Sequence, residues 1–309
     1  MIYTVTLNPS VDLFLDMNNL EYGKKNHVDD EFTLPGGKAI NVSRVLSQLN
    51  IPTVATGFTG GYQGDFIKEW LNKEDIMTDF VEIECQNRTN VKLLLNNEET
   101  TINSYGPSVS HEEIGELLHY LSRVGEGDTI VMGGSVPKLE DQDDYDIYQR
   151  MVSLAKANKA HFIADIPAEY LVKVIKEGPI LVKPNKEDLE IIFDTKIETK
   201  EQLAYYGKQI VEMGAKYAIV SYGAEGSMFF DDKGNAYMAD QIETEYVVNS
   251  VACRDAMIGG FIGTYVRISD PLEAYKMAVA VATATAKVVD LPNRKQIEDE
   301  LPLVKITKL

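Results

Sequence analysis

Four short apolar stretches decide the fold of this chain: Thr129–Met132 (TIVM), Phe162–Asp165 (FIAD), Ile180–Val182 (ILV) and Tyr217–Ser221 (YAIVS). Each stretch has the length and composition of a buried strand, and helix-forming segments separate them. Strands that alternate with helices in this way form a mostly parallel sheet with helices on both faces. We therefore predict an α/β fold.

The N-terminal part continues the same pattern. Strands are expected at Ile2–Leu7, which ends at a turn-forming Asn-Pro pair, and at Thr53–Phe58. Helices are expected at Lys38–Leu49 and over about Phe66–Asn72. The glycine-rich segment 56–65 (TGFTGGYQGD) matches neither G-x-x-x-x-G-K-[ST] nor G-x-G-x-x-G, so we interpret its glycines as turn residues.

Two hairpin-like insertions, Val11–Leu34 and Glu82–Tyr105, interrupt the pattern, and the second turns at Asn96–Glu99. Together they predict a small accessory sheet, which could act as a lid over the carboxyl ends of the strands, where ligands bind. Such a sheet needs a cover for its apolar face, and we expect bound substrate and a second subunit to provide it. The expected domains are a core of residues 1–10, 36–81 and 106–309 and a β-lid of residues 11–35 and 82–105.

A late antiparallel hairpin and two closing helices are expected after the fourth strand. The hairpin pairs Phe229–Asp231 with Ala236–Ala239, and the helices run over about Asp255–Ile268 and Leu272–Val289.

The stretch Val247–Phe261 (VVNSVACRDAMIGGF) predicts a strand end, a tight bend and a helix whose first turn carries Asp255. A helix N-terminus presents unpaired N–H groups and a partial positive charge, which suits a phosphate. An aspartate held there can take a proton from an attacking hydroxyl. The alternative is that Asp255 is only an acid favoured by the helix dipole.

Composition narrows the class of function. With 44% hydrophobic and 25% charged residues in 309, the chain is typical of a globular protein with a sizeable core. Its net charge of −18 argues against nucleic-acid binding but is compatible with a small anionic ligand held by local cations. Cys85 and Cys253 give neither a disulfide framework nor a metal-binding pattern. No signal peptide or membrane span is recognisable, so we expect a cytoplasmic protein without membrane contact.

Several motifs stand in a fixed order along the chain. The two most informative are Gly36–Leu46 (GGKAINVSRVL) and Asn249–Asp255 (NSVACRD). The others are Asn8–Asp12 (NPSVD), Arg88–Lys92 (RTNVK), Gly134–Pro137 (GSVP), Lys183–Asn185 (KPN) and Ser221–Gly226 (SYGAEG). In this order the set resembles the signatures of the ribokinase-like (PfkB) carbohydrate kinases over the whole length. Within that family, the chain most resembles the 1-phosphofructokinase and tagatose-6-phosphate kinase branch.

The resemblance implies a ribokinase-like three-layer α/β/α core with a β-lid. It further implies ATP- and Mg²⁺-dependent phosphorylation of a ketohexose phosphate, with fructose 1-phosphate favoured over tagatose 6-phosphate. Asp255 would be the general base. A homodimer formed through the β-lid is the expected assembly.

On the sugar side, the resemblance assigns Asp12 and Asn41 to the sugar hydroxyls, while Gly36 and Gly37 let the backbone approach the sugar. The alternative for Asp12 is an acid on the exposed face of a strand, and that for Asn41 is a polar helix residue facing solvent. Gly36 and Gly37 could simply form a turn.

Cations for the substrate phosphate are expected at Lys38 and Arg88, since a kinase for a phosphorylated sugar needs positive charge at the far end of its substrate. Lys92 is a third candidate. The alternative for each is a solvated surface charge.

On the nucleotide side, the resemblance assigns Lys183 and Asn185, with Asp188 orienting Mg²⁺ through water. The family pattern there is N-x-x-E, whereas this chain has N-x-x-D, and capping of the following helix is the alternative role. Three small residues would follow the nucleotide phosphates and ribose: Ser221, Gly223 and Gly226.

The chain departs from the family just before the expected base. The family pattern G-A-G-D is Ala252-Cys253-Arg254-Asp255 here, so both glycines are absent. The backbone of these residues would still hold the transferring phosphoryl group, because none of them is proline. Arg254 would stabilise the transferring charge, fill the anion site itself, or pair with Asp255 and weaken it, so a catalytically weakened homologue that binds nucleotide or sugar phosphate is the alternative. Cys253 is either a thiolate favoured by its position or a packed side chain.

Overall fold

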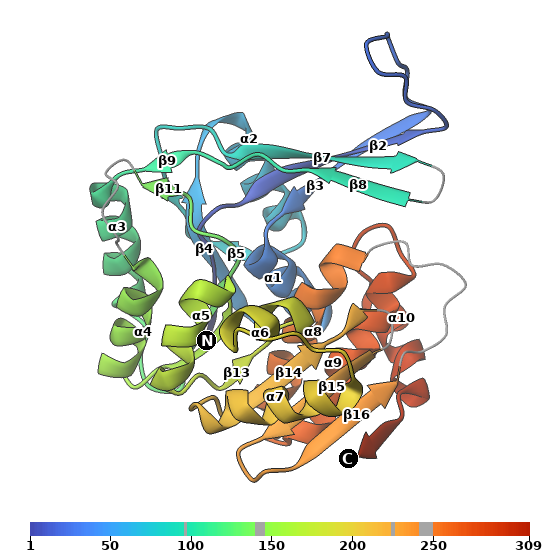
Figure 1. Cartoon of the computed structure of the whole chain (residues 1–309). Coiled ribbons are helices and arrows are strands. Elements are labelled where there is room, and N and C mark those ends of the chain that lie inside the picture. Colours follow the sequence, from blue (N-terminus) through green and yellow to red (C-terminus); the bar gives the residue numbers. More distant parts are fainter. Residues whose placement is uncertain (96–97, 140–145, 224–225, 241–249) are drawn as a thin grey trace.

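The computed structural model describes residues 1–95, 98–139, 146–223, 226–240 and 250–309 (Figure 1). Among these residues the largest sheet has eleven strands, in the order β17-β16-β15-β14-β13-β12-β10-β1-β4-β5, with β6 paired to β4. The strands are β1 Ile2–Thr6, β4 Thr53–Thr59, β5 Met77–Thr78, β6 Val81–Glu82, β10 Thr129–Gly133, β12 His161–Asp165, β13 Leu181–Val182, β14 Tyr217–Ser221, β15 Gly226–Asp231, β16 Ala236–Asp240 and β17 Ile306–Lys308.

The four apolar stretches of the sequence become β10, β12, β13 and β14, which lie side by side. From β5 and β6 at one end of the sheet to β14, neighbouring strands are parallel. Beyond β14, strands β15, β16 and β17 each pair with their neighbour in antiparallel orientation. The predicted late hairpin is therefore β15–β16, at the antiparallel end of the sheet.

Helices cover both faces of this sheet (Figure 1). Along β14, Ala218 and Val220 pack toward one set of helices, while Tyr217 and Ile219 pack toward the other. The first set is α3 His111–Leu121, α4 Ile147–Ala157, α5 Ala168–Val174 continued by the 3₁₀ turn η1 Ile175–Glu177, α6 Lys186–Ile192 and α7 Lys200–Glu212. The second is α1 Lys38–Gln48, α8 Ser250–Ile268 and α9 Pro271–Ala286. The three-layer α/β/α core is thus confirmed.

The smaller second sheet is also present, in the order β3-β2-β7-β8. Its strands are β2 Ser10–Met17, β3 Asp30–Gly36, β7 Arg88–Leu95 and β8 Glu98–Ile102, and it lies beyond α1 from the main sheet (Figure 1). The turn residues Asn96 and Asn97 lie outside the described residues. A further two-stranded sheet pairs β9 (Ser108–Val109) with β11 (Lys138–Leu139).

The two faces of the small sheet differ in character, because successive side chains of a strand point to opposite faces. Asp12, Phe14 and Lys92 line a pocket between this sheet and the core. Leu13 and Leu15 alternate with the first two, so they place an apolar strip on the outer face. One face of the small sheet is therefore available for chemistry and the other for packing.

Helix α2 spans Gly61–Lys73 and begins five residues earlier than the sequence predicts. Gly61 and Gly64 are therefore helical residues, and the interpretation of all four glycines as turn residues is wrong. The chain passes tightly over this helix start, since a Cβ on Gly61 would lie 2.5 Å from Cγ of Gln86. The Asn87 side chain accepts the N–H of Gly60 at 2.8 Å, which fixes that passage.

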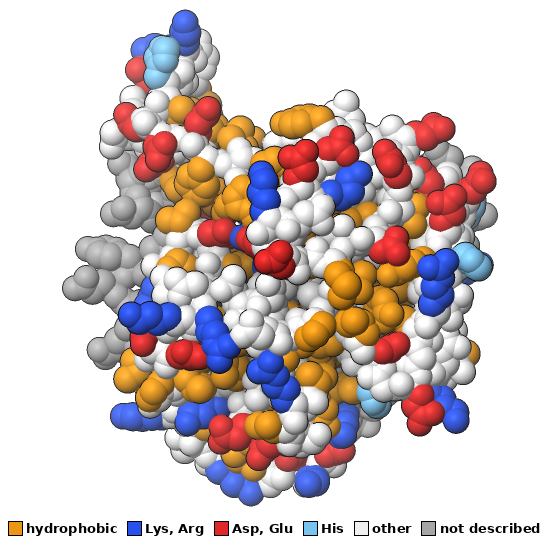
Figure 2. Space-filling view, turned by 180° about the vertical axis from the view of Figure 1, so that it is seen from behind, with side chains coloured by type: hydrophobic (Ala, Val, Ile, Leu, Met, Phe, Trp, Pro, Cys, Tyr) orange, Lys and Arg blue, Asp and Glu red, His pale blue; other side chains and the backbone are white. Residues whose placement is uncertain are grey.

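The C-terminal end is longer in secondary structure than expected. Helix α10 (Arg294–Glu300), the 3₁₀ turn η3 (Leu301–Leu303) and β17 follow α9, so the two predicted helices do not close the chain. Seen from the other side, the molecule carries acidic side chains over its upper part, and the basic ones lower down are interspersed with acidic and apolar ones (Figure 2). That face offers no continuous basic stripe.

Candidate active site

The candidate site lies at the carboxyl end of the main sheet. From β1 the chain moves to β4 on one side, whereas β10, β12, β13 and β14 follow one another on the other side. At such a switch point the connections diverge and open the crevice in which open α/β sheets bind ligands. Helix α1 begins here and touches the end of β10, since a Cβ on Gly133 would lie 2.8 Å from the backbone nitrogen of Ala39. Only glycine permits that approach.

Helix α1 carries two of the predicted site residues, one turn apart. Its N-cap is Gly37, whose φ of 138° strains any other residue. The Lys38 ammonium lies 3.1 Å from Oδ1 of Asp165, at the end of β12. The Asn41 side-chain amide donates to Oδ2 of Asp255, on α8, at 3.0 Å. One helix therefore delivers a cation and a hydrogen-bond donor to two buried carboxylates.

Asp165 is a site residue that the motifs do not predict. It is 6% exposed, and its Oδ2 is buried and accepts no hydrogen bond from the part of the chain that the structure describes. Burial opposes ionisation, but the charges of Lys38 and Lys183 hold the pKa of Asp165 below its ordinary value. The available sequence signal was an acid that closes a strand at the carboxyl edge of a parallel sheet.

Asp255 is 3% exposed, and its pKa is perturbed as well. Burial first, and the nearby Asp165 carboxylate second, raise the pKa of Asp255 to about 6. Lys38, the Asn41 hydrogen bond and Lys183 act in the opposite direction. A carboxylate with this pKa is mostly ionised at neutral pH and still accepts a proton readily, which are the requirements of a general base.

The helix that carries Asp255 begins at Ser250, so Asp255 is its sixth residue and does not lie in the first turn. The expected bend at Ala252–Arg254 is therefore helix in this structure, and residues 247–249 lie outside the described part. Only the first four N–H groups of a helix lack a partner within the helix. Arg254 and Asp255 lie beyond those four. The role of this backbone toward a phosphoryl group stays a prediction.

The two unusual side chains before Asp255 differ in exposure. Burial, and then the charge of Asp255, raise the pKa of the half-buried Cys253 to about 12, which favours the packed alternative over the thiolate. Arg254 is exposed, and its charge reaches Asp165 and Lys183. No ion pair among the described residues joins Arg254 to Asp255, so the expected pairing of these two side chains is not formed in this structure.

Asp12 is held between strands of the small sheet. Its Oδ1 accepts hydrogen bonds from Ser10 Oγ at 2.7 Å and from Asn90 Nδ2 at 2.8 Å. A Cβ on Gly36 would lie 2.6 Å from the same oxygen, so glycine there makes room for the carboxylate. The pocket under the sheet brings Asp12 together with Asn41 and Ala252, from three separate elements.

The two cations of the small sheet have different partners. Arg88 donates through Nη1 to the carbonyl of Ser104 at 3.0 Å and through Nη2 to that of Asn8 at 3.1 Å. Both acceptors are neutral, and within the described ranges Arg88 forms no ion pair, so its charge remains available to an anion. Lys92 instead lies 3.4 Å from Oε1 of Glu99 and is buried, which makes it the weaker candidate.

The predicted nucleotide side gathers beyond the ends of β13 and β14. Asn185 caps α6 by a reciprocal pair of bonds: its Oδ1 accepts the Asp188 N–H at 2.7 Å, and Asp188 Oδ2 accepts the Asn185 N–H at 2.9 Å. The backbones of Asn185 and Ser221 also pair in an isolated parallel β-bridge. Gly223 and Gly226 have φ of 71° and 116°, and the two residues between them lie outside the described part. The capping role is therefore real, and any contact with nucleotide or metal stays a prediction.

Lys183 is 2% exposed, and burial lowers its pKa, although Asp165 opposes this effect. Burial raises the pKa of Asp188. A bound anion would stabilise the buried ammonium of Lys183, and a bound cation would stabilise the carboxylate of Asp188. Mg²⁺ takes few protein oxygens and keeps most of its waters, so Asp188 and the unpartnered Oδ2 of Asp165 suit it. Across the described ranges, no group of three or more His, Cys, Asp or Glu side chains is arranged to hold a metal on its own.

None of the helices in the described part has the length and apolar character that crossing a membrane requires.

Comparisons with known proteins agree with this geometry. The pfkB family of carbohydrate kinases matches residues 5–292. The chain is 36% identical over 309 residues to the 1-phosphofructokinase of Bacillus subtilis, with 100% of both chains covered. It is 31% identical over 310 residues to the D-tagatose-1-phosphate kinase of Bacillus licheniformis, again covering 100% of both. Among solved structures, phosphofructokinase-2 of Escherichia coli superposes with a TM-score of 0.91 over 98% of each chain at 23% identity, a likeness of fold.

Proposed function

Because the chain belongs to the pfkB family of carbohydrate kinases and is a sugar-phosphate kinase, we propose that it transfers the γ-phosphoryl group of ATP to a ketohexose 1-phosphate. Fructose 1-phosphate is the favoured substrate. Tagatose 1-phosphate becomes its first competitor in place of tagatose 6-phosphate, since a relative that is 31% identical is named for it. The observation that carries the proposal is the buried Asp255 carboxylate, held by Asn41 in the crevice at the switch point.

Arg88 is assigned to the phosphate already on the substrate. It is held in position by two neutral carbonyls and belongs to the same sheet as Asp12. An arginine fork positioned in this way is suited to a phosphate. Asp12, with Asn90 beside it and the Gly36 backbone opposite, would accept the sugar hydroxyls.

Lys38 is assigned to the phosphoryl group that is transferred from ATP, and not to the phosphate already on the substrate. The acids whose charges act on Lys38 are Asp165, Asp255 and Asp188, whereas the acid that acts on Arg88 is Asp12. The two cations therefore serve different ends of the substrate. Lys38 would neutralise the phosphoryl group as charge develops on it.

Catalysis begins when Asp255 accepts the proton of the attacking hydroxyl, which Asp12 and Asn41 orient. ATP would supply the phosphoryl group, and Asp188, acting through water, and Asp165 would hold Mg²⁺, which would neutralise charge on that group. Lys183, with Asn185 and Ser221, would contact the nucleotide. The β-lid would exclude water from the pocket and so suppress hydrolysis of ATP.

A coupled ADP-release assay with four substrates tests the proposal: fructose 1-phosphate, tagatose 1-phosphate, fructose 6-phosphate and tagatose 6-phosphate. We expect turnover of a 1-phosphate and a loss of about 10²–10⁴-fold in kcat for Asp255→Asn. Fructose and tagatose differ at one hydroxyl, so their kcat/KM ratio measures how that hydroxyl is recognised.

A catalytically weakened homologue is the second candidate, favoured by the helical start of α8 where the family has two glycines. Tight ATP binding with no turnover of any of the four sugar phosphates would establish it.

We also propose a homodimer through the outer face of the small sheet. That face carries Leu13, Leu15, Val91 and Leu93, which are only partly buried in the single chain, and Ile102, which is 56% exposed. An apolar sheet face of this kind needs a cover.

A further inference from the structure

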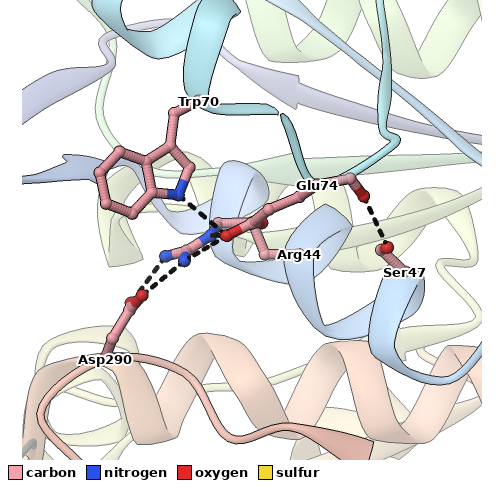
Figure 3. A network of polar contacts seen from close by, with 5 residues as sticks. All are labelled: Arg44, Ser47, Trp70, Glu74 and Asp290. Atoms are coloured by element: carbon pink, nitrogen blue, oxygen red, sulfur yellow. Dashed lines mark hydrogen bonds and ion pairs between the residues drawn. The ribbon is translucent and has the colours of Figure 1, made fainter. Parts of the chain in front are cut away.

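Arg44 sits at a joint between three elements (Figure 3). It lies on α1 and is 4% exposed. Its guanidinium contacts the Glu74 carboxylate at 2.6 Å and the Asp290 carboxylate at 2.6 Å, with two or more hydrogen bonds to each. Glu74 is the C-cap of α2, and Asp290 follows α9. A planar guanidinium can form paired hydrogen bonds to two carboxylates at once, a geometry that an ammonium with three donors cannot reproduce.

The surroundings of this joint leave it little freedom. The indole of Trp70 donates to Oε1 of Glu74 at 2.8 Å, and the Arg44 guanidinium lies 5.7 Å from the centre of the Trp70 ring. Ser47, also on α1, donates to the backbone carbonyl of Glu74 at 3.0 Å. Helix α1 is thus tied to α2 at two successive turns.

The N-terminal end of α1 is less securely held by its own sequence. Its N-cap Gly37 contributes no side-chain hydrogen bond, and its first turn contains no acidic residue. The helix is therefore positioned by tertiary contacts: in the first turn Thr6 Oγ1 accepts the Ile40 N–H at 3.1 Å and Lys38 pairs with Asp165, and further along Arg44 adds its two carboxylate contacts. Asn41 lies one turn before Arg44 and donates to Asp255 across the α1–α8 interface. Arg44, Asp290 and Asn41 all line the pocket that also contains Asp12.

We propose that Arg44 is a positioning residue of the reaction: by clamping Glu74 and Asp290, it holds α1 where Asn41 meets the carboxylate of Asp255. Arg44 acts through Asn41 and does not touch the reacting atoms. The inference rests on the proposed function of Asp255 as the base. It assigns to the arginine of the GGKAINVSRVL stretch a task distinct from substrate binding.

A double-mutant cycle of Arg44→Met and Asn41→Ala tests this. Removing the Asn41 bond removes one interaction that holds the pKa of Asp255 down, so both single variants should move the acid limb of the kcat/KM profile to higher pH. Lys38 on α1, Asp165 on β12, Lys183 after β13 and Cys253 on α8 also face Asp255 and stay unchanged. We expect kcat to fall about tenfold and KM to change by less than about threefold. The double variant should show no further shift, because coupled residues are not additive.

A second readout does not depend on turnover. Carboxyl ¹³C resonances of aspartate-labelled protein should include one that titrates near pH 6 and is lost in Asp255→Asn. In Arg44→Met that resonance should titrate at higher pH. If the wild-type enzyme turns over none of the sugar phosphates, the proposed function fails, while this titration still decides the role of Arg44.

Two further variants control the experiment. Arg44→Lys keeps the charge and protects against loss of folding, and it should give a smaller shift in the same direction. Arg294→Met removes the exposed pair with Glu298, 2.7 Å apart on α10, and should leave the profile unchanged. A less stable Arg44→Met protein whose acid limb and ¹³C titration stay at their wild-type positions would overturn the proposal, as would additive effects in the double variant.

Discussion

At the residue scale, the burial that suits Asp255 to the proposed role of general base also has a cost in stability. Its folded pKa of about 6 lies above the ordinary value of 3.8, so the folded protein binds this proton more tightly than the unfolded chain. The stabilisation from that proton is full below the ordinary pKa and is lost as the pH rises through about 6. At neutral pH the ionised, buried form therefore destabilises the fold.

We predict that Asp255→Asn, although inactive, is more stable than wild type by about 1–3 kcal/mol at neutral pH. The difference should shrink as the pH falls from about 7.5 to 5, where the wild-type carboxyl becomes protonated. Urea unfolding of both proteins across this range measures it. A difference that is constant with pH would contradict the burial of a charged carboxylate at this position.

Sequence reasoning at this scale finds residues that belong to motifs and misses those that do not. Asp255 and Asn41 were expected to act separately, yet they are bonded to each other across two helices. Asp165 stands in no motif, and its importance follows from the strand order, which puts the end of β12 beside α1. Such a neighbour cannot be read from local spacing. The cysteine shows the same limit, because its pKa is set by tertiary burial and not by its place near a helix start.

At the element scale, the packing of α1 on α8 aligns the site. Asn41 meets Asp255, and four residues further along both helices Val45 meets Gly259, where an added Cβ would lie 2.7 Å from Cγ1 of Val45. The next contact is Gly263 against Leu46. The two helices therefore run in the same direction and pack closely one turn after the Asn41–Asp255 hydrogen bond.

Gly259→Ala should force α8 away from α1 and destabilise the protein by about 1–3 kcal/mol through overpacking. It should also lower kcat, because the Asn41–Asp255 bond lies one turn away. Gly115→Ala in α3 is the matched control: nothing lies within 4 Å of its added Cβ, and alanine should stabilise that helix by about 0.5–1 kcal/mol. Urea unfolding and kinetics of both variants provide the test, and equal stabilities for the two would refute the close-packing account.

The apolar periodicity of the sequence predicts the types and the order of the elements. The predicted helix starts are wrong where contacts in the folded chain override local sequence preferences. Helix α2 begins within a glycine run because the segment ending at Asn87 crosses its start. Helix α8 begins at Ser250, five residues before the predicted position. Both errors fall at the start of a helix, where boundaries are the least certain part of an assignment.

At the scale of the whole molecule, the small sheet divides two tasks between its faces. Its inner face lines the pocket with Asp12 and Lys92, and its outer face carries the apolar strip. A dimer through the outer face would fix each lid at its back while leaving the pocket side free.

We predict that Leu93→Asp on the outer face converts a wild-type dimer into a monomer, because a charge there would be buried without a partner. Sedimentation velocity measures the change. Met77→Asp, on the 50% exposed edge position of β5, should leave the assembly intact. A monomeric wild-type protein, or a dimer that survives Leu93→Asp, would show that this face is not the interface.

The joint around Arg44 has one more consequence, which is optical. Trp70 is the single tryptophan of the chain, and it is bonded to Glu74 and lies beside the Arg44 guanidinium. All of the tryptophan emission of this protein therefore arises where the Arg44 contacts join α1, α2 and the segment after α9. Intrinsic fluorescence thus reports on that joint directly, without any label, as ligands enter the neighbouring pocket.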